Sequence, residues 1–189
     1  MNWLLHNPRR WWAFTLTILL LGLGWTWYSR VPLSVASAGQ IPSPREGFPA
    51  PDFSLKTLEN GETVSLADYR GRVVIVNLWA SWCGPCRAEM PALQMVYAAQ
   101  QARGLEVLAI NSTVQDSEAA AGAFVQEFHL TFPVLLDQTG DVGQRYRLLS
   151  LPSTFFIDRK GVIRSVIFGG PMAEAVLLSK VEDLLLEAP

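Results

Sequence analysis

The sequence has few of the residues that bind metals or form structural crosslinks. Only two cysteines and two histidines occur among its 189 residues. A structural zinc site needs four ligands, usually cysteine or histidine, and no third cysteine is present to join the pair. His6 lies beside an apolar segment, and His129 lies far downstream of the cysteines. This scarcity of ligands argues against a zinc site.

Acidic residues are absent from the first 30 positions, which contain Arg9, Arg10 and Arg30. The rest of the chain carries 12 basic and 17 acidic side chains, a net charge of −5. A nucleic-acid-binding protein would show a concentration of basic residues, so this balance argues against nucleic acid as a partner. The sequence contains no internal repeat and no low-complexity tract. Half of the residues are hydrophobic, which permits one domain with a substantial core.

One long hydrophobic run is present, over residues 11–28, and it contains no charged residue. As a helix, this run would span about 27 Å, close to the ~30 Å hydrocarbon core of a bilayer. Aromatic residues favour the two membrane interfaces. They occur at both ends of the run, as Trp11, Trp12, Trp25, Trp27 and Tyr28. The run therefore predicts a transmembrane anchor.

The arginines predict the orientation of this anchor. Because basic residues concentrate before the run, the positive-inside rule places residues 1–10 in the cytosol and residues 31–189 outside it. A cleaved signal peptide is the alternative, since Ala36-Ser37-Ala38 resembles a cleavage site. Either interpretation places the cysteines in an extracytoplasmic compartment, where disulfides persist. Residues 29–50, rich in proline, serine, alanine and glycine, predict a linker.

The two cysteines stand two residues apart in Trp82-Cys83-Gly84-Pro85-Cys86. A strand-like run over residues 73–79 leads into this motif, and a helical pattern follows it. A Cys-X-X-Cys pair at such a junction is typical of a redox-active dithiol. Unpaired N–H groups at the helix N-terminus would favour a thiolate on Cys83. A purely structural disulfide would close so short a loop that it would stabilise the fold only weakly.

The rest of the sequence alternates strand and helix patterns, which predicts an α/β domain over residues 51–189 with helices on both faces of a sheet. Strands are expected at residues 52–55, 62–66, 72–79, 105–111, 133–136, 153–158 and 162–168. Helices are expected at residues 87–103, 116–129, 142–148 and 173–187. Asp116 or Ser117 is expected to cap the second helix, and Gly104 to end the first.

The strand–Trp-Cys-Gly-Pro-Cys–helix unit, together with the segment Leu151-Pro152-Ser153-Thr154, resembles the thioredoxin superfamily. The chain is most similar to its membrane-anchored, extracytoplasmic branch of the TlpA/ResA type. The resemblance covers residues 48–187, and Ala50-Pro51-Asp52-Phe53 is similar to the start of redoxin-type domains. It implies a thioredoxin-like fold with a central mixed sheet flanked by helices. An extra N-terminal hairpin and a helix–strand insertion at residues 116–136 would be added, beside one N-terminal transmembrane helix.

The resemblance also implies roles for individual residues. Cys83 matches the nucleophilic cysteine of the family, and Cys86 matches its resolving partner. Pro152 matches the cis-proline that faces the disulfide, which would leave the Leu151 backbone free to pair with a bound substrate segment. Pro91 matches a proline that kinks the helix. The residues expected to contact substrate are Trp82, Gly84, Pro85, Leu151 and Pro152.

Glu89 lies three residues after Cys86, on the same face of the predicted helix. It resembles an acid that tunes the thiols and handles their protons in this branch; the alternative is a first-turn acid stabilised by the helix dipole. Asn77 stands where cytosolic thioredoxins carry a buried aspartate. Because asparagine cannot titrate, Glu89 is the candidate proton acceptor. Trp79 and Trp82 are expected to shield the site, although simple packing explains them equally well.

The features together predict a thiol-disulfide oxidoreductase that uses its own disulfide and needs no organic cofactor and no metal. The Gly84-Pro85 dipeptide matches reducing thioredoxins, which predicts a reductant. The resemblance implies as partners a protein disulfide (apocytochrome c or a copper-site protein), a membrane dithiol donor and membrane lipid.

Two other functions remain open. A redoxin-type thiol peroxidase would need a Thr-x-x-Cys setting, and Ala80 stands at the threonine position. In a copper-binding assembly chaperone, soft thiolates would hold Cu(I). The copper-chaperone relatives, however, use a wider cysteine spacing and an added histidine.

Overall fold

The computed structural model describes residues 8–28 and 41–187. Residues 1–39 and 40–189 form separate units. In the first unit, helix α1 (Pro8–Tyr28) exposes large apolar side chains from Trp11 to Trp25. Among the described residues, no helix combines the length and the apolar character needed to cross a membrane. The transmembrane anchor predicted over residues 11–28 is therefore not confirmed, and the alternative cleavage site at 36–38 lies outside the described residues.

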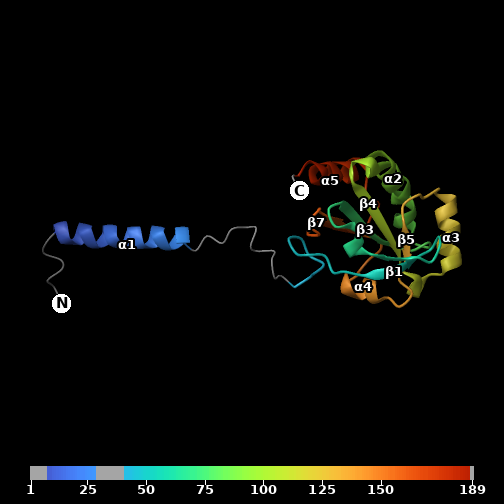
Figure 1. Cartoon of the computed structure of the whole chain (residues 1–189), viewed down its shortest axis with the longest axis horizontal. Helices are drawn as coiled ribbons and strands as arrows, with labels where there is room; N and C mark the ends of the chain where they lie inside the picture. Colours follow the sequence, from blue (N-terminus) through green and yellow to red (C-terminus); the bar gives the residue numbers. More distant parts are fainter. Residues whose placement is uncertain (1–7, 29–40, 188–189) are drawn as a thin grey trace. The chain divides into compact units, whose positions relative to one another are not determined.

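Seven strands of the second unit form one mixed sheet in the order β2-β1-β5-β4-β3-β6-β7 (Figure 1). The strands are β1 (Ser54–Thr57), β2 (Thr63–Ser65), β3 (Val73–Trp79), β4 (Leu105–Asn111), β5 (Val134–Leu136), β6 (Ser153–Ile157) and β7 (Ile163–Phe168). Neighbours β3, β4 and β5 run parallel, and the other pairs are antiparallel. The inserted strand β5 therefore joins the N-terminal hairpin to the central strands.

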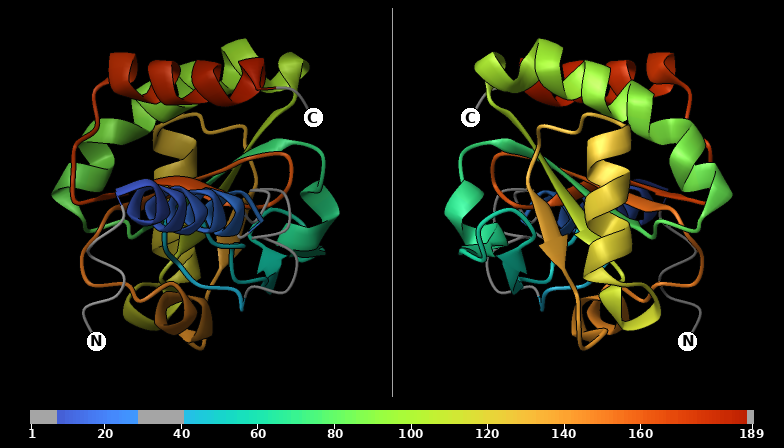
Figure 2. Two further views of the ribbon diagram at one scale, coloured as in Figure 1. Left: turned by 90° about the vertical axis from the view of Figure 1, so that its left-hand side faces the viewer. Right: turned by 90° about the vertical axis from the view of Figure 1, so that its right-hand side faces the viewer.

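Helices cover both faces of this sheet. They are α2 (Gly84–Gln100), α3 (Glu118–Glu127), α4 (Asp141–Arg145) and α5 (Glu174–Leu186), with 3₁₀ turns η1 (Leu66–Tyr69), η2 (Gln101–Arg103) and η3 (Thr113–Gln115). Helices α2 and α5 lie side by side (Figure 2), and they share one core layer with α3. The second layer lies between the sheet, α4 and η1. The predicted thioredoxin-like α/β fold, with its hairpin and its helix–strand insertion, is confirmed.

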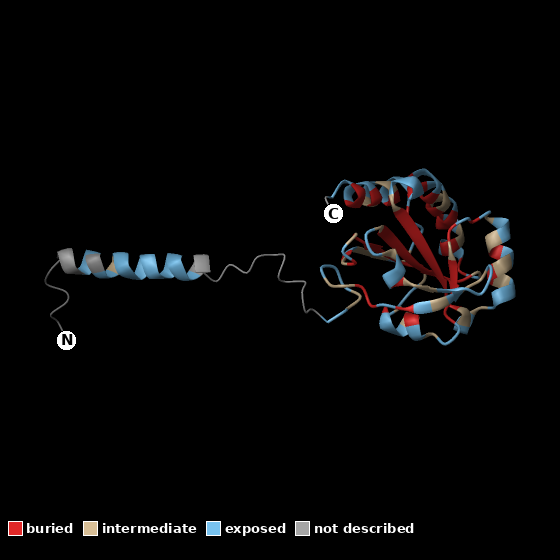
Figure 3. Ribbon diagram, viewed as in Figure 1, coloured by how far each residue is buried: buried red, intermediate tan, exposed pale blue. Residues whose placement is uncertain are grey.

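Strands β3 and β4 are buried along their whole length because both faces of the sheet are covered (Figure 3). Successive side chains of a strand point to opposite faces. Accordingly, Val73 and Ile75 belong to the core layer beneath α2, whereas Val74 and Val76 belong to the opposite layer. The same alternation places the side chain of Asn77 on the α2 side, where it meets the helix that follows the cysteines.

The N-terminal hairpin departs from the predicted boundaries. Asp52 accepts hydrogen bonds from the backbone N–H groups of Phe53 and Ala67, at 3.0 and 3.1 Å, and lies before the first strand, which begins at Ser54. The second strand ends one residue earlier than predicted, because the Ser65 N–H donates to the Asp68 carboxylate at the start of η1. Near the start of β1 and at the end of β2, hydrogen bonds to aspartate side chains thus compete with the backbone hydrogen bonds of the sheet.

Two helices are shorter than predicted. Helix α3 begins at Glu118, capped by the Ser117 hydroxyl, which accepts from the Ala120 N–H at 3.1 Å. The predicted helix over residues 142–148 ends at Arg145, because Arg147 adopts a left-handed φ of 50°. The predicted glycine at the end of the helix after the cysteines is confirmed: Gly104 has a φ of 100° after η2.

Phe124 anchors α3 to the sheet. Its ring centroid lies 4.5 Å from those of Trp79 and Phe128, and the residue is 2% exposed. We expect Phe124→Ala to lower the free energy of unfolding, measured with urea, by about 3–5 kcal/mol. Val176→Ala on α5 is the control, because Val176 is 43% exposed and its truncation should cost less than about 0.5 kcal/mol. Equal effects of the two variants would contradict this packing.

Candidate active site

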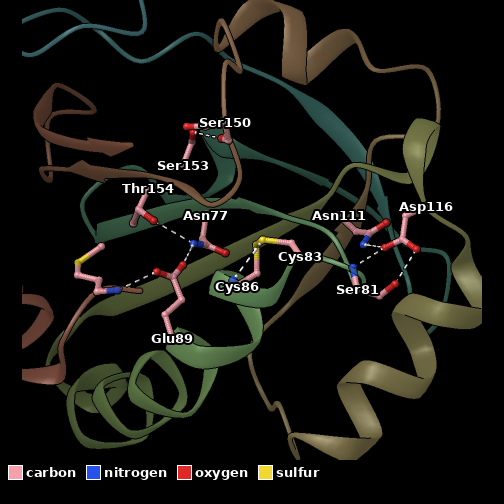
Figure 4. The surroundings of a disulfide bond; sticks show 11 residues. Asn77, Ser81, Cys83, Cys86, Glu89, Asn111, Asp116, Ser150, Ser153 and Thr154 are labelled. Atoms are coloured by element: carbon pink, nitrogen blue, oxygen red, sulfur yellow. Dashed lines mark hydrogen bonds between the residues drawn. A yellow bond between two sulfur atoms is a disulfide. The ribbon is translucent and has the colours of Figure 1, made fainter. Parts of the chain in front are cut away.

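The two cysteines lie where β3 turns into α2 (Figure 4). Cys83 is the N-cap of α2, and Gly84, Pro85 and Cys86 form its first turn. Proline is tolerated there because the first N–H groups of a helix have no helical partner. A disulfide joins Cys83 and Cys86. The strand–Cys-X-X-Cys–helix arrangement expected from the sequence is therefore present.

The two sulfur-bearing residues have different surroundings. Cys86 is fully buried, whereas Cys83 is 4% exposed and lines a surface groove of about 340 Å³. The Cys86 N–H donates to the Cys83 Sγ at 3.2 Å. This donor and the positive end of the helix dipole would stabilise a thiolate on Cys83 after reduction. The position of Cys83 at the groove and the stabilisation of its thiolate both favour Cys83 as the residue that attacks the substrate.

The groove beside Cys83 is lined by both apolar and polar residues and carries no charged side chain among them. It is lined by residues 82–85, by Gln115 and by residues 148–151. Of the predicted substrate contacts, Trp82, Gly84, Pro85 and Leu151 line the groove, whereas Pro152 does not. Trp82 is 58% exposed, so of the two tryptophans only buried Trp79 is packed inside the core.

The Leu151–Pro152 peptide bond is cis, as the resemblance implies. The Pro152 carbonyl accepts from the Gly169 N–H at 2.8 Å, which holds this loop against the end of β7. A side chain at Gly170 would begin 2.9 Å from Pro152 Cγ and 3.0 Å from Glu89 Oε2, too close for any residue but glycine. The loop before β6, the segment after β7 and helix α2 therefore meet tightly around Glu89.

Glu89 lies in this meeting point and is only 2% exposed. Its Oε1 accepts from Asn77 Nδ2 at 2.9 Å, and its Oε2 accepts from the Met172 N–H at 3.2 Å. Burial raises the pKa of Glu89, and the two hydrogen bonds act in the opposite direction. Helix α2 has no acid in its first turn, so the alternative of a simple dipole-stabilised acid does not fit.

Asn77 connects Glu89 to the sheet. Its Nδ2 also donates to Thr154 Oγ1 at 2.9 Å, from the position directly opposite on β6. Its Oδ1 is buried and has no hydrogen-bond partner among the described residues. In Figure 4 this oxygen lies on the disulfide side of the amide. The amide nitrogen of Asn77 is thus bound by Glu89 and Thr154, whereas its amide oxygen makes no hydrogen bond within the described residues.

Sequence reasoning did not connect Asp116, Thr154 or Met172 to the site. A signal for Asp116 exists, because it follows β4, and the carboxyl ends of neighbouring parallel strands meet at one edge of a sheet. Thr154 could follow only from the register between β3 and β6. Met172 contributes its backbone N–H, so no side-chain pattern could reveal it.

Metal-ligating side chains do not cluster in the part of the chain that the structure describes: no group of three or more histidine, cysteine, aspartate or glutamate residues could hold an ion there. The reactive group of this site is the Cys83–Cys86 disulfide. A disulfide at a helix N-terminus, one sulfur facing a groove and a buried carboxyl behind it, can perform thiol–disulfide exchange.

Comparisons with known proteins agree with this chemistry. Residues 47–166 match the AhpC/TSA family. The thioredoxin-like protein YneN of Bacillus subtilis is 40% identical over 163 residues, 85% of this chain and 91% of that protein. The thiol-disulfide oxidoreductase ResA of Oceanobacillus iheyensis is 38% identical over 144 residues, 75% and 71% of the two chains. A thioredoxin-family thiol:disulfide interchange protein from Chlorobium tepidum superposes with a TM-score of 0.67 at 27% identity, covering 77% of this chain and 98% of that chain.

Proposed function

The chain belongs to the AhpC/TSA family of thioredoxin-like proteins and is a thiol-disulfide oxidoreductase of the ResA type, and we propose that it reduces protein disulfides outside the cytoplasm. The observation that carries this proposal is the Cys83–Cys86 disulfide at the edge of an uncharged groove. Such a groove suits an apolar polypeptide segment that carries a disulfide. The buried carboxyl of Glu89, three residues after Cys86 on α2, supplies a group for proton transfer.

The reaction follows from the positions of the two sulfurs. The Cys83 thiolate attacks one sulfur of the substrate disulfide; a mixed disulfide forms, and the other substrate sulfur leaves as a thiolate. Cys86, deprotonated by Glu89, then attacks the Cys83 Sγ and displaces the second substrate sulfur. The chain ends as the disulfide, having given two electrons to the substrate. The two protons lost by its thiols balance those gained by the substrate thiols.

The reducing direction is supported by the Gly84-Pro85 dipeptide, which matches that of reducing thioredoxins. We propose a membrane dithiol protein as electron donor, and apocytochrome c or copper-site cysteines as substrates, on the strength of the TlpA/ResA resemblance. The test is the equilibrium reduction potential of the full chain, titrated against glutathione or dithiothreitol. A value near that of thioredoxin, about −270 mV, is expected; a value near that of DsbA, about −120 mV, would contradict a reducing role.

The extracytoplasmic location is supported by the uncharged apolar run over residues 11–28 and the arginines before it. We propose that this run holds the chain on the membrane, with lipid as its partner. Fractionation of cells with N-terminal sequencing tests this proposal. An intact chain in alkali-washed membranes is expected, a mature chain that starts at Gly39 would indicate a cleaved signal peptide instead, and an intact chain in the cytosol would contradict both.

A thiol peroxidase is the second candidate, because Ala50-Pro51-Asp52-Phe53 is similar to the start of redoxin-type domains, an opening that peroxiredoxins share. Turnover of hydrogen peroxide by the reduced chain would favour it over disulfide reduction. Ala80 argues against it, since alanine cannot supply the hydroxyl of a Thr-x-x-Cys setting.

Tight copper retention that is lost in His129→Ala would instead favour a copper-binding chaperone.

A further inference from the structure

The turn that presents Cys83 has few hydrogen bonds of its own. Its backbone closes with one bond, from the Cys83 N–H to the Ala80 carbonyl at 3.2 Å. The two middle residues, Ser81 and Trp82, are held by another part of the chain, the segment of residues 112–117 between β4 and α3. Figure 4 shows the contacts between Ser81 and Asp116. The geometry of the turn therefore depends on a segment about 35 positions away in the sequence.

Asp116 makes the main contacts. Its Oδ2 accepts from the Ser81 N–H at 2.7 Å and from Asn111 Nδ2 at 2.9 Å. Its Oδ1 accepts from the Ser81 hydroxyl at 2.7 Å and from the Ser117 N–H at 2.9 Å. Burial on its own raises the pKa of this carboxyl, but the four donors together hold it below its ordinary value. The group is thus an anion that binds both donors of Ser81.

The same segment fixes a wall of the substrate groove. The Trp82 indole Nε1 donates to the Gln115 carbonyl at 3.0 Å, and both residues line the groove. The segment is itself tied to the sheet, because the Ser112 N–H donates to the Trp79 carbonyl at 2.9 Å. This segment therefore connects the end of β3 to Ser81 and Trp82, because Asp116 binds Ser81 and the Gln115 carbonyl binds Trp82.

We propose that Asp116 is a positioning residue for the exchange reaction: it clamps the Ser81–Trp82 turn, so that Cys83 and the Trp82 ring are held in place for a disulfide substrate. Attack of a thiolate on a disulfide needs alignment of the reacting sulfurs, and a misplacement of about 1 Å can cost roughly 10²-fold in rate. This inference rests on the proposed function, because the clamp acts on the sulfur that attacks the substrate.

The test uses the full chain and a peptide that contains one disulfide. Asp116→Ala removes both contacts to Ser81, and we expect kcat/KM to fall at least tenfold, with a raised KM because the Trp82 wall is released. Asp116→Asn is the rescue variant. Its amide oxygen can accept from the Ser81 N–H and its amide nitrogen can donate to the Ser81 hydroxyl. That nitrogen no longer accepts from the Ser117 N–H, but both contacts to Ser81 are kept, so KM should stay within threefold of the wild-type value.

Two control variants separate the clamp from general loss of stability. Ser117→Ala removes the N-cap of α3 but leaves the bonds between Asp116 and Ser81. Asp158→Ala removes another largely buried aspartate, which holds the turn between β6 and β7 by accepting from the N–H groups of Lys160 and Val162 at 2.9 Å. Both controls should unfold at lower urea concentration and keep KM within twofold.

A folded Asp116→Ala variant with wild-type KM would overturn the clamp, and so would an equal loss in Ser117→Ala. If Asp116→Ala does not fold, Ser81→Ala decides the question, because it deletes only the hydroxyl contact. Its kcat/KM should fall about threefold, and an unchanged value would overturn the proposal. A wild-type chain inactive toward the peptide would contradict the proposed function, whereas an active wild type beside an unchanged variant would contradict only the clamp.

Discussion

A Cys83→Ser variant should lose reduction of a peptide disulfide almost completely, by on the order of a thousandfold or more in kcat/KM. The thiolate is the nucleophile of thiol–disulfide exchange, and a serine hydroxyl is not ionised at neutral pH. Cys83 is the sulfur-bearing residue that lines the groove. The measurement is the rate at which the reduced full chain converts the peptide disulfide to its dithiol.

Cys86→Ser is the matched variant for this prediction. It keeps the attacking sulfur, so one turnover should form the mixed disulfide between Cys83 and the peptide. Release then stops, because the resolving sulfur is missing. Mass spectrometry under non-reducing conditions should show the adduct on Cys86→Ser and none on Cys83→Ser. The opposite pattern would reverse the roles of the two cysteines.

A Glu89→Gln variant should slow the release of the mixed disulfide by roughly 10²-fold, at the lower end of the range for general acid–base catalysis. Glutamine cannot accept the proton of Cys86. Because burial raises the pKa of Glu89, its carboxylate forms at a higher pH than that of an ordinary glutamate. The wild-type rate of release should therefore rise as the pH passes through this raised pKa. Stopped-flow measurements should show that the variant lacks this rise.

The same carboxyl should make stability depend on pH. Between the ordinary carboxyl pKa of 4.5 and the raised pKa of the folded state, the unfolded chain binds fewer protons than the folded chain. The stabilisation linked to Glu89 is therefore fully present below the ordinary value and is lost as pH rises through the folded value. In Glu89→Gln this part of the decrease should disappear from urea-unfolding curves recorded across that range.

Glu106→Gln is the control for the release measurement. Burial also raises the pKa of Glu106, and the residue pairs with Arg72 at 3.2 Å. It lies near the start of β4, opposite Val74, whereas the disulfide follows the other end of β3. This variant should change stability and leave the release of the mixed disulfide unchanged. A Glu89→Gln variant that behaves like Glu106→Gln would remove Glu89 from the reaction.

The fold class and the identity of the reactive group follow from the sequence alone. The apolar runs of β3 and β4 indicate strands buried on both faces, and the helical pattern after the cysteines indicates a crossover helix. The Cys-X-X-Cys pair, the Gly104 helix end and the choice of Asp116 or Ser117 as the cap of α3 are local features. Each depends on residues within one turn of the chain, so the sequence pattern contains all the information needed to predict it.

The surroundings of the disulfide, in contrast, depend on contacts between distant parts of the chain. Glu89 takes one donor from the strand before it and another from Met172, 83 positions later. Asp116, predicted at most as a helix cap, instead holds the Ser81 turn. A buried carboxylate accepts from any donor that the fold brings within reach, and neither residue type nor periodicity specifies that donor. Strand register and the path of two loops set these contacts, because they alone bring distant segments to the same edge of the sheet.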